Sequence, residues 1–365
     1  MRRKKIKRIA VLTSGGDAQG MNSAVRAVTR RALDAGIEVY ASMGGYYGLV
    51  HDVMKKLTAV DVANIEPLGG TVIWTDRCDE FRYEEGMQKA IATCAKYKID
   101  AVIAIGGDGT FRGATDLSIR GIPTVGVPGT IDNDITASDY TIGFDTAMNR
   151  ATEAFDSLRD TCQSHNRINV LECMGRGCGD IALRSGLAAG AIGIAIPEVP
   201  FDEDALIERI KKAEVAGKRS LLISVSEGVA EKDGKPFGEY LTAKLNALCK
   251  AGEIKHDARF CRLAHVFRGG NPTLRDRDTA TRMGAYAVDM VIRGESDRVV
   301  LEREGKLVSM EIRYALAVDK MYKGKLKEGD LDRFSAKDIA GMKAICEERR
   351  TEAAELSALA DSLCI

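Results

Sequence analysis

Three short segments of the chain combine glycines with hydroxyls and carboxylates. Thr13–Gly20 reads TSGGDAQG, Gly106–Thr110 reads GGDGT, and Pro128–Asp134 reads PGTIDND. Glycines lack Cβ atoms, so backbone N–H groups near them can approach phosphate oxygens closely. Carboxylates provide oxygen ligands for a divalent metal ion and can accept a proton from a hydroxyl group. We therefore expect these segments to bind a phosphate with its metal ion and to transfer a phosphoryl group.

The carboxylates of the second and third segments have different expected roles. Asp108 suits Mg²⁺, because magnesium takes one or two carboxylates and fills its other positions with phosphate oxygens and water. Of Asp132 and Asp134, one can act as general base while the other neutralises charge near the metal. Structural alternatives are open for each segment. The first could be a βα turn without a ligand, Asp108 could cap a helix, and the third segment could be a solvated turn.

The elements that must position these segments follow a βα rhythm, which predicts a parallel α/β sheet. A helix is expected from Asn22 to Ala35, closed by Gly36, a second α/β unit after Phe144, and one or two surface helices from Leu331 to Ile365. Strands are expected at Ile9–Leu12, Ala101–Ile105, Thr124–Val127, Asn169–Cys173, Ile192–Ile196, Ser220–Val225 and Arg298–Leu301. Ligands bind beyond the carboxyl ends of such strands, where the three segments stand.

Arginines near the ends of later expected strands suggest phosphate recognition, because a planar guanidinium binds two phosphate oxygens at once. For any single arginine, a surface ion pair is an equally open reading. The residues concerned are Arg167, Met174, Gly175, Arg176, Glu227, Arg259, His265 and Arg268.

Composition limits the classes of partner. The 53 basic and 53 acidic residues cancel, so no global field favours nucleic acid or a membrane. Four scattered histidines and nine cysteines without a C-x-x-C pair encode no metal cage of the zinc type. The basic start, Met1–Arg8, precedes too short an apolar run for a signal peptide, and no apolar run approaches a membrane span. The cytoplasm is the expected compartment.

Together these motifs closely resemble the 6-phosphofructokinase family, from about Lys7 to Tyr322. The motifs that carry the resemblance are the three segments above, Met174-Gly175-Arg176, Arg268-Gly269-Gly270 and Met283-Gly284-Ala285-Tyr286-Ala287. The resemblance implies an α/β fold of two doubly wound, Rossmann-like parallel-sheet domains, assembled as a homotetramer. The implied lobes are 1–142 with about 270–322 for the nucleotide and 143–269 for the sugar phosphate, followed by a C-terminal helical extension, 323–365.

The resemblance also implies a role for each site residue. Asp132 would deprotonate the C1 hydroxyl of fructose 6-phosphate, while Thr130, Arg176 and the backbone N–H of Gly16 help in catalysis. Asp108 would hold Mg²⁺ on the ATP phosphates. The implied ATP site comprises Gly16, Arg77, Cys78, Gly107, Asp108, Gly109 and Thr110. The implied sugar-phosphate site comprises Thr130, Asp132, Asp134, Arg167, Met174, Gly175, Arg176, Glu227, Arg259, His265 and Arg268. Arg167 and Arg259 would come from a neighbouring subunit, so active sites would be shared between subunits.

Two glycines favour ATP over pyrophosphate as the donor. The pyrophosphate-dependent branch of the family tends to carry Asp at the position of Gly109 and Lys at that of Gly129. Glycine at 109 leaves room for the α-phosphate of a nucleotide. Departures from the family pattern at Gln19, Asp76 and Phe267 leave the nucleotide affinity open, since Asp76 adds a negative charge beside Arg77.

The effector site of bacterial relatives is only partly matched, so we expect weak or absent activation by ADP. Basic residues of that site are present at Arg26, Arg30, Arg159, Lys218 and Arg219. Other family positions hold Ala59, Ala216, Ser220 and, in place of an acid, Ile192.

Alternative functions stay open at this stage. NAD kinases and diacylglycerol kinases share the Gly-Gly-Asp-Gly-Thr motif but lack the later arginines. Within the resembling family, the alternatives are a pyrophosphate-dependent phosphofructokinase and a catalytically weak regulatory paralogue.

Overall fold

A computed structural model describes residues 6–364, which form two compact units. The first comprises the chain up to Ile131, Ile135–Thr146 and Arg268–Cys346; the second comprises Asp132–Asp134, Ala147–Phe267 and the chain from Glu347. The expected lobe boundaries stay a proposal, and the segment 323–365, expected as an extension, is divided between the units. Most of the basic start, up to Lys5, and the C-terminal Ile365 lie outside the described residues.

The first unit is built on a seven-stranded sheet in the order β11-β10-β5-β4-β1-β2-β3. Neighbouring strands are parallel, except that β3 and β11 run antiparallel to β2 and β10. The strands are β1 Arg8–Ser14, β2 Glu38–Ser42, β3 Met54–Leu57, β4 Ala101–Gly106, β5 Thr124–Pro128, β10 Arg298–Arg303 and β11 Lys306–Glu311.

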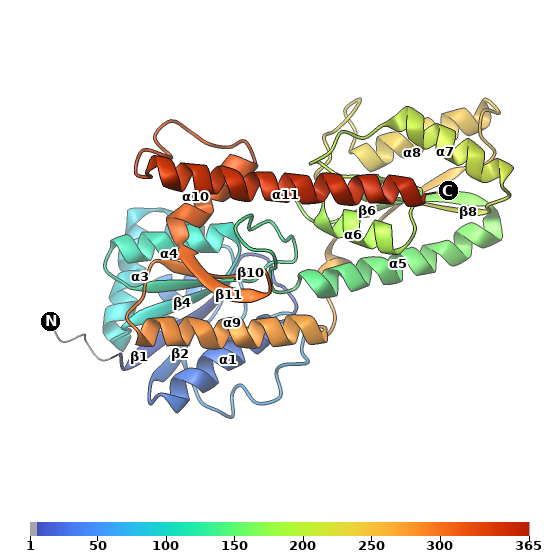
Figure 1. The fold of residues 1–365 in the computed structure, drawn as a ribbon. Coiled ribbons are helices and arrows are strands. Elements are labelled where there is room, and N and C mark those ends of the chain that lie inside the picture. Colours follow the sequence, from blue (N-terminus) through green and yellow to red (C-terminus); the bar gives the residue numbers. More distant parts are fainter. Residues whose placement is uncertain (1–5, 365) are drawn as a thin grey trace. The chain divides into compact units, whose positions relative to one another are not determined.

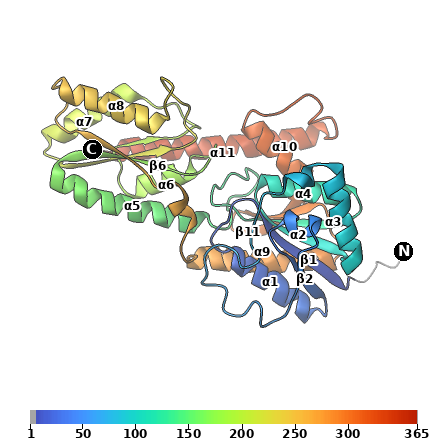
Figure 2. The same ribbon diagram turned by 180° about the vertical axis from the view of Figure 1, so that it is seen from behind.

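Helices cover both faces of this sheet, which is why its central strands are continuous apolar runs. Helices α1 and α9 lie side by side on one face, and α3, α4 and α10 on the other (Figures 1 and 2). The helices of this unit are α1 Met21–Asp34, α2 Tyr46–Val50, the 3-10 turn η1 Asp79–Arg82, α3 Glu84–Tyr97, α4 Asp108–Ile119, α9 Leu274–Ile292 and α10 Ile312–Tyr322.

The second unit contains a four-stranded, entirely parallel sheet in the order β7-β8-β6-β9. Its strands are β6 Arg167–Cys173, β7 Gly193–Ala195, β8 Ser220–Ser226 and β9 Ala258–Arg262. Helices α7 and α8 pack on one face through an apolar cluster, and α5 and α6 cover the other (Figure 1). The helices are α5 Phe144–His165, α6 Asp180–Ala188, α7 Glu203–Val215, α8 Phe237–Lys250, the 3-10 turn η2 Ala264–Arg268 and α11 Ala336–Leu363. The first residues of α5 and of α11, and the last residue of η2, belong to the first unit.

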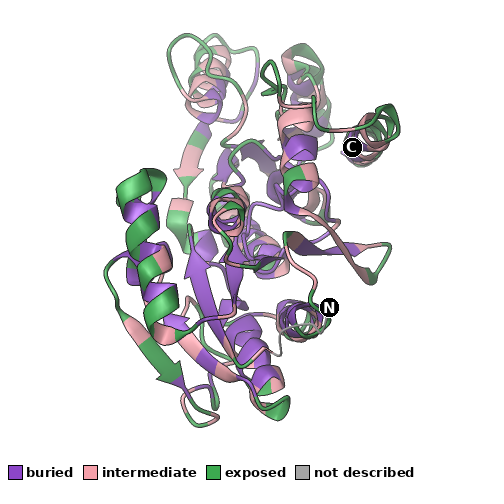
Figure 3. Cartoon of the chain, turned by 90° about the vertical axis from the view of Figure 1, so that its left-hand side faces the viewer, coloured by how far each residue is buried: buried purple, intermediate pink, exposed green. Residues whose placement is uncertain are grey.

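Buried residues are concentrated on the strands and the inward faces of the helices (Figure 3). The α/β fold with parallel sheets is confirmed, as are a strand at each expected position and a helix after the first segment. The C-terminal segment contains the expected helix, α11, and most of its residues are exposed or half-buried. That helix buries Met342, Cys346, Arg349 and Ala353, a spacing that places them on one side of a helix.

Candidate active site

The first glycine turn leaves β1 and is held against Arg268. A Cβ atom on Gly16 would lie 2.7 Å from Nη1 of Arg268, so a side chain there would displace the guanidinium. Arg268 is buried, and its Nη1 donates to the backbone oxygen of Asp17 at 3.0 Å. Arg268, which the sequence placed among sugar-phosphate residues, thus contacts the turn that carries Gly16.

The second turn lies directly beside the first, because Ser14 at the end of β1 pairs with Gly106 at the end of β4. The hydroxyl of Thr110 donates to the backbone oxygen of Ser14 at 2.9 Å. A Cβ atom on Gly106 would lie 2.4 Å from that same oxygen. The first unit therefore brings two of the three predicted segments together at the carboxyl ends of adjacent strands.

Asp108 is the first residue of α4, and its side chain is 26% exposed. Its Oδ1 accepts the backbone N–H of Gly109 at 2.7 Å, and its Oδ2 pairs with Arg112 one turn along the helix. Within residues 6–364, no group of three or more His, Cys, Asp or Glu side chains could hold a metal ion. A single accessible carboxylate beside glycines fits Mg²⁺ only where phosphate oxygens and water supply the other ligands.

The segment with Arg77 and Cys78 follows residues that pack on the first turn. The hydroxyl of Thr75 donates to the backbone oxygen of Gly15 at 2.7 Å. The carboxylate of Asp76 accepts the backbone N–H of Arg77 at 2.7 Å. Arg77 is exposed, Cys78 is half-buried, and burial raises the pKa of the Cys78 thiol. Both predicted nucleotide residues therefore follow a segment anchored to the glycine turn.

The third segment leaves β5 next to the second turn. The backbone N–H of Gly129 donates to the oxygen of Gly106 at 3.0 Å, and a Cβ atom on Gly107 would lie 3.9 Å from the Cβ atom of Thr130. Thr130 is buried, and its backbone oxygen accepts the hydroxyl of Thr141 at 2.7 Å. Thr130 is thus fixed beside the glycines that precede Asp108.

Asp132, two residues after Thr130, belongs to the second unit together with Asp134. Its side chain is 1% exposed, and its Oδ2 lies 3.3 Å from Nε of Arg176. Arg176 has a positive φ of 52°, unusual for a residue with a side chain. The carboxylate of Glu227 accepts the backbone N–H groups of Gly175 and Arg176, at 3.1 and 2.8 Å. Glu227 therefore holds the loop that brings Arg176 to Asp132.

Arg167 and Arg259 share one carboxylate. Nε of Arg167 lies 3.1 Å from Oδ1 of Asp257, and Nη2 of Arg259 lies 2.7 Å from Oδ2. The two arginines come from adjacent strands, β6 and β9, so the sheet brings them together. Met174 follows β6 directly and is half-buried, whereas His265 is exposed in η2.

Sequence reasoning missed three residues that contact the predicted site: Asp180, Asp257 and Arg349. Asp257 precedes β9, Ala258–Arg262, a short strand without regular alternation of polar and apolar residues. Arg349 stands in a helical pattern with Met342 and Cys346, and that spacing is the signal that could have found it.

A family model described as Phosphofructokinase matches residues 8–291. The chain belongs to the phosphofructokinase family. This confirms the resemblance inferred from the motifs, and family members named 6-phosphofructokinase are kinases.

Two curated members of the family illustrate the similarity. The ATP-dependent 6-phosphofructokinase of Clostridioides difficile is 45% identical over 317 residues, covering 87% of this chain and 96% of that protein. The ATP-dependent 6-phosphofructokinase of Bacillus subtilis is 46% identical over 307 residues, covering 84% and 93%.

Solved phosphofructokinase structures share the fold. That of Saccharomyces cerevisiae aligns with a TM-score of 0.81 at 33% identity over 96% of this chain, which spans about half (49%) of the yeast chain. A pyrophosphate-dependent phosphofructokinase from Marinobacter aquaeolei aligns with a TM-score of 0.72 at 22% identity, covering 84% of this chain and 83% of that one, which shows the shared fold alone. In the described part of the chain, every helix is too short or too polar to cross a membrane.

Proposed function

We propose that this chain transfers the terminal phosphoryl group of ATP to the C1 hydroxyl of fructose 6-phosphate, giving fructose 1,6-bisphosphate and ADP. The names and high coverage of the bacterial relatives support this reading. The observation that carries it is the buried carboxylate of Asp132 beside Arg176. A base next to a guanidinium is what transfer of a phosphoryl group to a hydroxyl requires.

In this mechanism, Asp132 accepts the proton of the C1 hydroxyl as the C1 oxygen forms its bond to the γ-phosphorus. The bond from that phosphorus to the bridging oxygen of ADP breaks, and ADP leaves. Arg176, Thr130 and the backbone N–H of Gly16 stabilise the charge on the phosphoryl oxygens. Bound to the ATP phosphates, Mg²⁺ would neutralise part of their charge, and Asp108 would hold it. Asp134 assists near that metal.

The remaining site residues bind the substrates. Arg77, Cys78 and the turn from Gly107 to Thr110 bind ATP. Sugar-phosphate binding is assigned to Arg167, Met174, Gly175, Glu227, Arg259, His265 and Arg268. Asp257 pairs with both Arg167 and Arg259 and so holds the two guanidinium groups close together. Two such groups side by side can bind one phosphate group. The proposed assembly is a cytoplasmic homotetramer in which these two arginines serve a neighbouring subunit.

ATP is the proposed donor because a Cβ atom added to Gly109 would meet nothing within 4 Å. The space that a nucleotide needs beside this turn is therefore open in the first unit, as ATP requires. The same turn with intact Asp108 also argues against a regulatory paralogue without turnover.

A coupled assay tests the phosphoryl donor, the acceptor and the catalytic activity of the protein together. Purified protein with Mg²⁺ and fructose 6-phosphate is offered ATP and pyrophosphate in turn, and product is followed through aldolase. We expect turnover with ATP and none with pyrophosphate. Turnover with pyrophosphate alone would reverse the donor assignment, and no turnover with either would favour the regulatory paralogue. Diacylglycerol and NAD offered with ATP serve as acceptor controls.

A further inference from the structure

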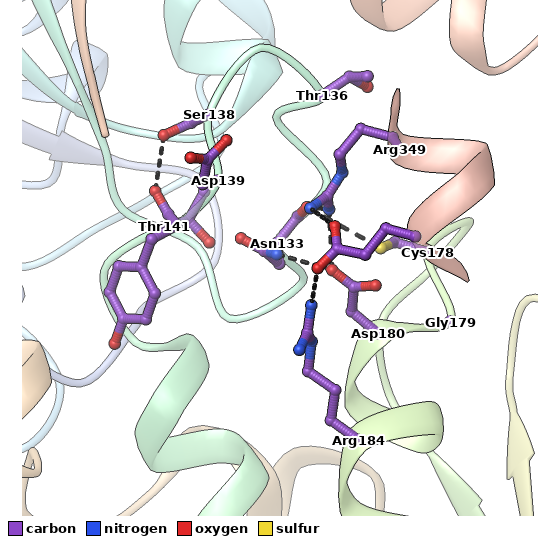
Figure 4. Close-up of polar contacts among 12 residues, drawn as sticks. Asn133, Thr136, Ser138, Asp139, Thr141, Cys178, Gly179, Asp180, Arg184 and Arg349 are labelled. Carbon is purple, nitrogen blue, oxygen red and sulfur yellow. Dashed lines mark hydrogen bonds and ion pairs between the residues drawn. The ribbon is translucent and has the colours of Figure 1, made fainter. Parts of the chain in front are cut away.

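The second unit contains a buried guanidinium that the proposed mechanism does not use. Arg349 on α11 is 8% exposed, and its Nη2 lies 2.8 Å from Oδ2 of Asp180. The same nitrogen is 3.4 Å from the backbone oxygen of Asn133 (Figure 4). Nη1 of Arg349 is 3.5 Å from Glu352. The guanidinium thus reaches the residue that separates Asp132 from Asp134.

Asn133 is held from two sides. Its amide nitrogen donates to Oδ2 of Asp180 at 2.7 Å, so this one oxygen accepts from both Asn133 and Arg349 (Figure 4). The φ angle of Asn133 is 48°, in the left-handed region, which asparagine adopts more readily than most other residues with a side chain. Its neighbours on both sides are the two predicted carboxylates. Any relaxation of Asn133 therefore turns the backbone that aims Asp132.

The charges around this network require a cation. Asp180 is buried and Glu198 is half-buried, and the backbone N–H of Gly179, the residue before Asp180, donates to Glu198 at 2.9 Å. Burial lowers the pKa of Arg349, but Asp180 and Cys178 outweigh it and leave the pKa above its ordinary value. Removing one partner of a buried ion pair leaves an uncompensated charge. Without Arg349, the buried carboxylate of Asp180 would lose its cationic partner, and its bond to Asn133 would change.

We propose that Arg349 is a positioning residue for the general base. Acting through Asp180 and the backbone oxygen of Asn133, it fixes the conformation of Asp132–Asp134 and so aims the carboxylate of Asp132. The inference rests on the proposed function, in which Asp132 is the base. It assigns to the C-terminal helix a contribution to turnover rather than to substrate affinity, because Arg349 contacts no residue of the predicted ATP or sugar-phosphate sites except through this tripeptide.

The full-length Arg349→Met variant tests the inference, since methionine fills similar volume without charge. We expect kcat to fall by about tenfold or more, as for a catalytic group displaced by a fraction of an ångström, with KM for ATP unchanged. Arg349→Lys, which restores the charge but not the fork, should recover part of kcat. Arg350→Met, an exposed neighbour on the same helix, should keep the kcat of the wild type.

A double-variant cycle with Asp180→Asn separates positioning from a general loss of stability. Because both side chains act through Asn133, the kcat of the double variant should be no lower than that of the poorer single variant. Multiplying losses, or an Arg349→Met enzyme with the kcat of the wild type, would overturn the inference. If Arg349→Met does not fold, Arg349→Lys decides: a lowered kcat at unchanged KM for ATP supports it, and the kcat of the wild type overturns it. A wild-type enzyme inactive on fructose 6-phosphate would instead refute the proposed function.

Discussion

The guanidinium of Arg176 lies 3.3 Å from the carboxylate of Asp132, although the two residues stand on different loops of the second unit. A carboxylate that is 1% exposed needs a partner of opposite charge, and Arg176 provides one. It also places a cation beside the oxygen to which a phosphoryl group would be transferred. In the proposed mechanism, this one contact would therefore serve both proton acceptance and charge stabilisation.

Replacing Asp132 by Asn should lower kcat by about 10²–10⁴-fold, because the amide cannot accept the hydroxyl proton. Binding of magnesium ATP should stay unchanged, since the predicted nucleotide residues belong to the first unit. Steady-state kinetics and calorimetric titration with a non-hydrolysable ATP analogue measure the two effects. Equal turnover of wild type and variant would show that Asp132 is not the base.

Substitutions at Gly109 test the donor assignment. Gly109→Ala should fold and use ATP, because a Cβ atom there meets nothing within 4 Å. Gly109→Asp should raise KM for ATP by about tenfold or more, since a carboxylate would enter the space of the phosphates and repel them. Initial rates over a range of ATP concentrations give the comparison. An Asp variant with the KM of the Ala variant would exclude a steric and electrostatic role for this position.

Shared active sites predict complementation between two defective subunits. Arg259→Ala should raise KM for fructose 6-phosphate by about tenfold, because one charged hydrogen-bond donor to phosphate is lost. When Arg259→Ala subunits are co-expressed with Asp132→Asn subunits, some active sites should contain both an intact Asp132 and an intact Arg259. At a low concentration of fructose 6-phosphate, the activity of the mixed oligomers should then exceed the sum of the activities of the two parent variants. A purely additive result would mean that each subunit builds its own site.

Glu198→Gln should alter how stability depends on pH. Burial raises the pKa of Glu198 above its ordinary 4.5, while the N–H of Gly179 and the charge of Arg349 oppose the rise. A carboxyl group that binds its proton more tightly when folded stabilises the fold at low pH, and this stability is lost as pH rises through the folded pKa.

The glutamine variant cannot ionise and should lack that loss. The stability of the variant relative to wild type, measured by unfolding in urea, should therefore be greater at pH 8 than at pH 5. Glu208→Gln, on the exposed face of α7, provides the matched control and should show the same difference at both values. If the two variants behaved alike, burial of Glu198 would have no consequence for its titration.

ADP should not activate this enzyme at low concentrations of fructose 6-phosphate. Arg26 is paired with Glu66 at 2.6 Å, and Arg219 donates to the backbone oxygen of Gln163 at 3.1 Å. Ile192, at a position where relatives have an acid, is buried and offers no ligand. Rates measured with and without ADP decide the point. Strong activation combined with sigmoidal dependence on fructose 6-phosphate would contradict the prediction.

The predictable part of the fold consists mainly of strands that are buried, apolar runs. Ala101–Gly106, for example, is buried along its whole length, and such a strand is a continuous apolar run in the sequence. Edge strands and charged strands were missed for the opposite reason. Met54–Leu57 has two exposed lysines, and Lys306–Glu311 is only partly covered. Their pairing depends on the neighbouring strand rather than on their own pattern.

The glycine turns were predictable because backbone geometry dictates their residues, as the close approach at Gly106 shows. The partners of the turns were not. Glu227 holds Arg176 through two backbone N–H groups, and Asp257 joins two arginines, yet neither contact follows from local spacing. Such contacts arise only when distant segments meet in the folded chain. The contacts of Arg349 were also not predicted, because a charged residue is not expected on the buried face of a helix such as α11.

The tripeptide Asp132–Asp134 belongs to the second unit, while the residues on both sides of it belong to the first. A fragment cut before Ala147 and after Phe267 would lose the proposed base, and a fragment of the other half would carry it without its ion-pair partner. Chimaeras with relatives joined at a single point would meet the same obstacle. The two halves of this chain are therefore not interchangeable modules, and in evolution they are expected to be inherited together.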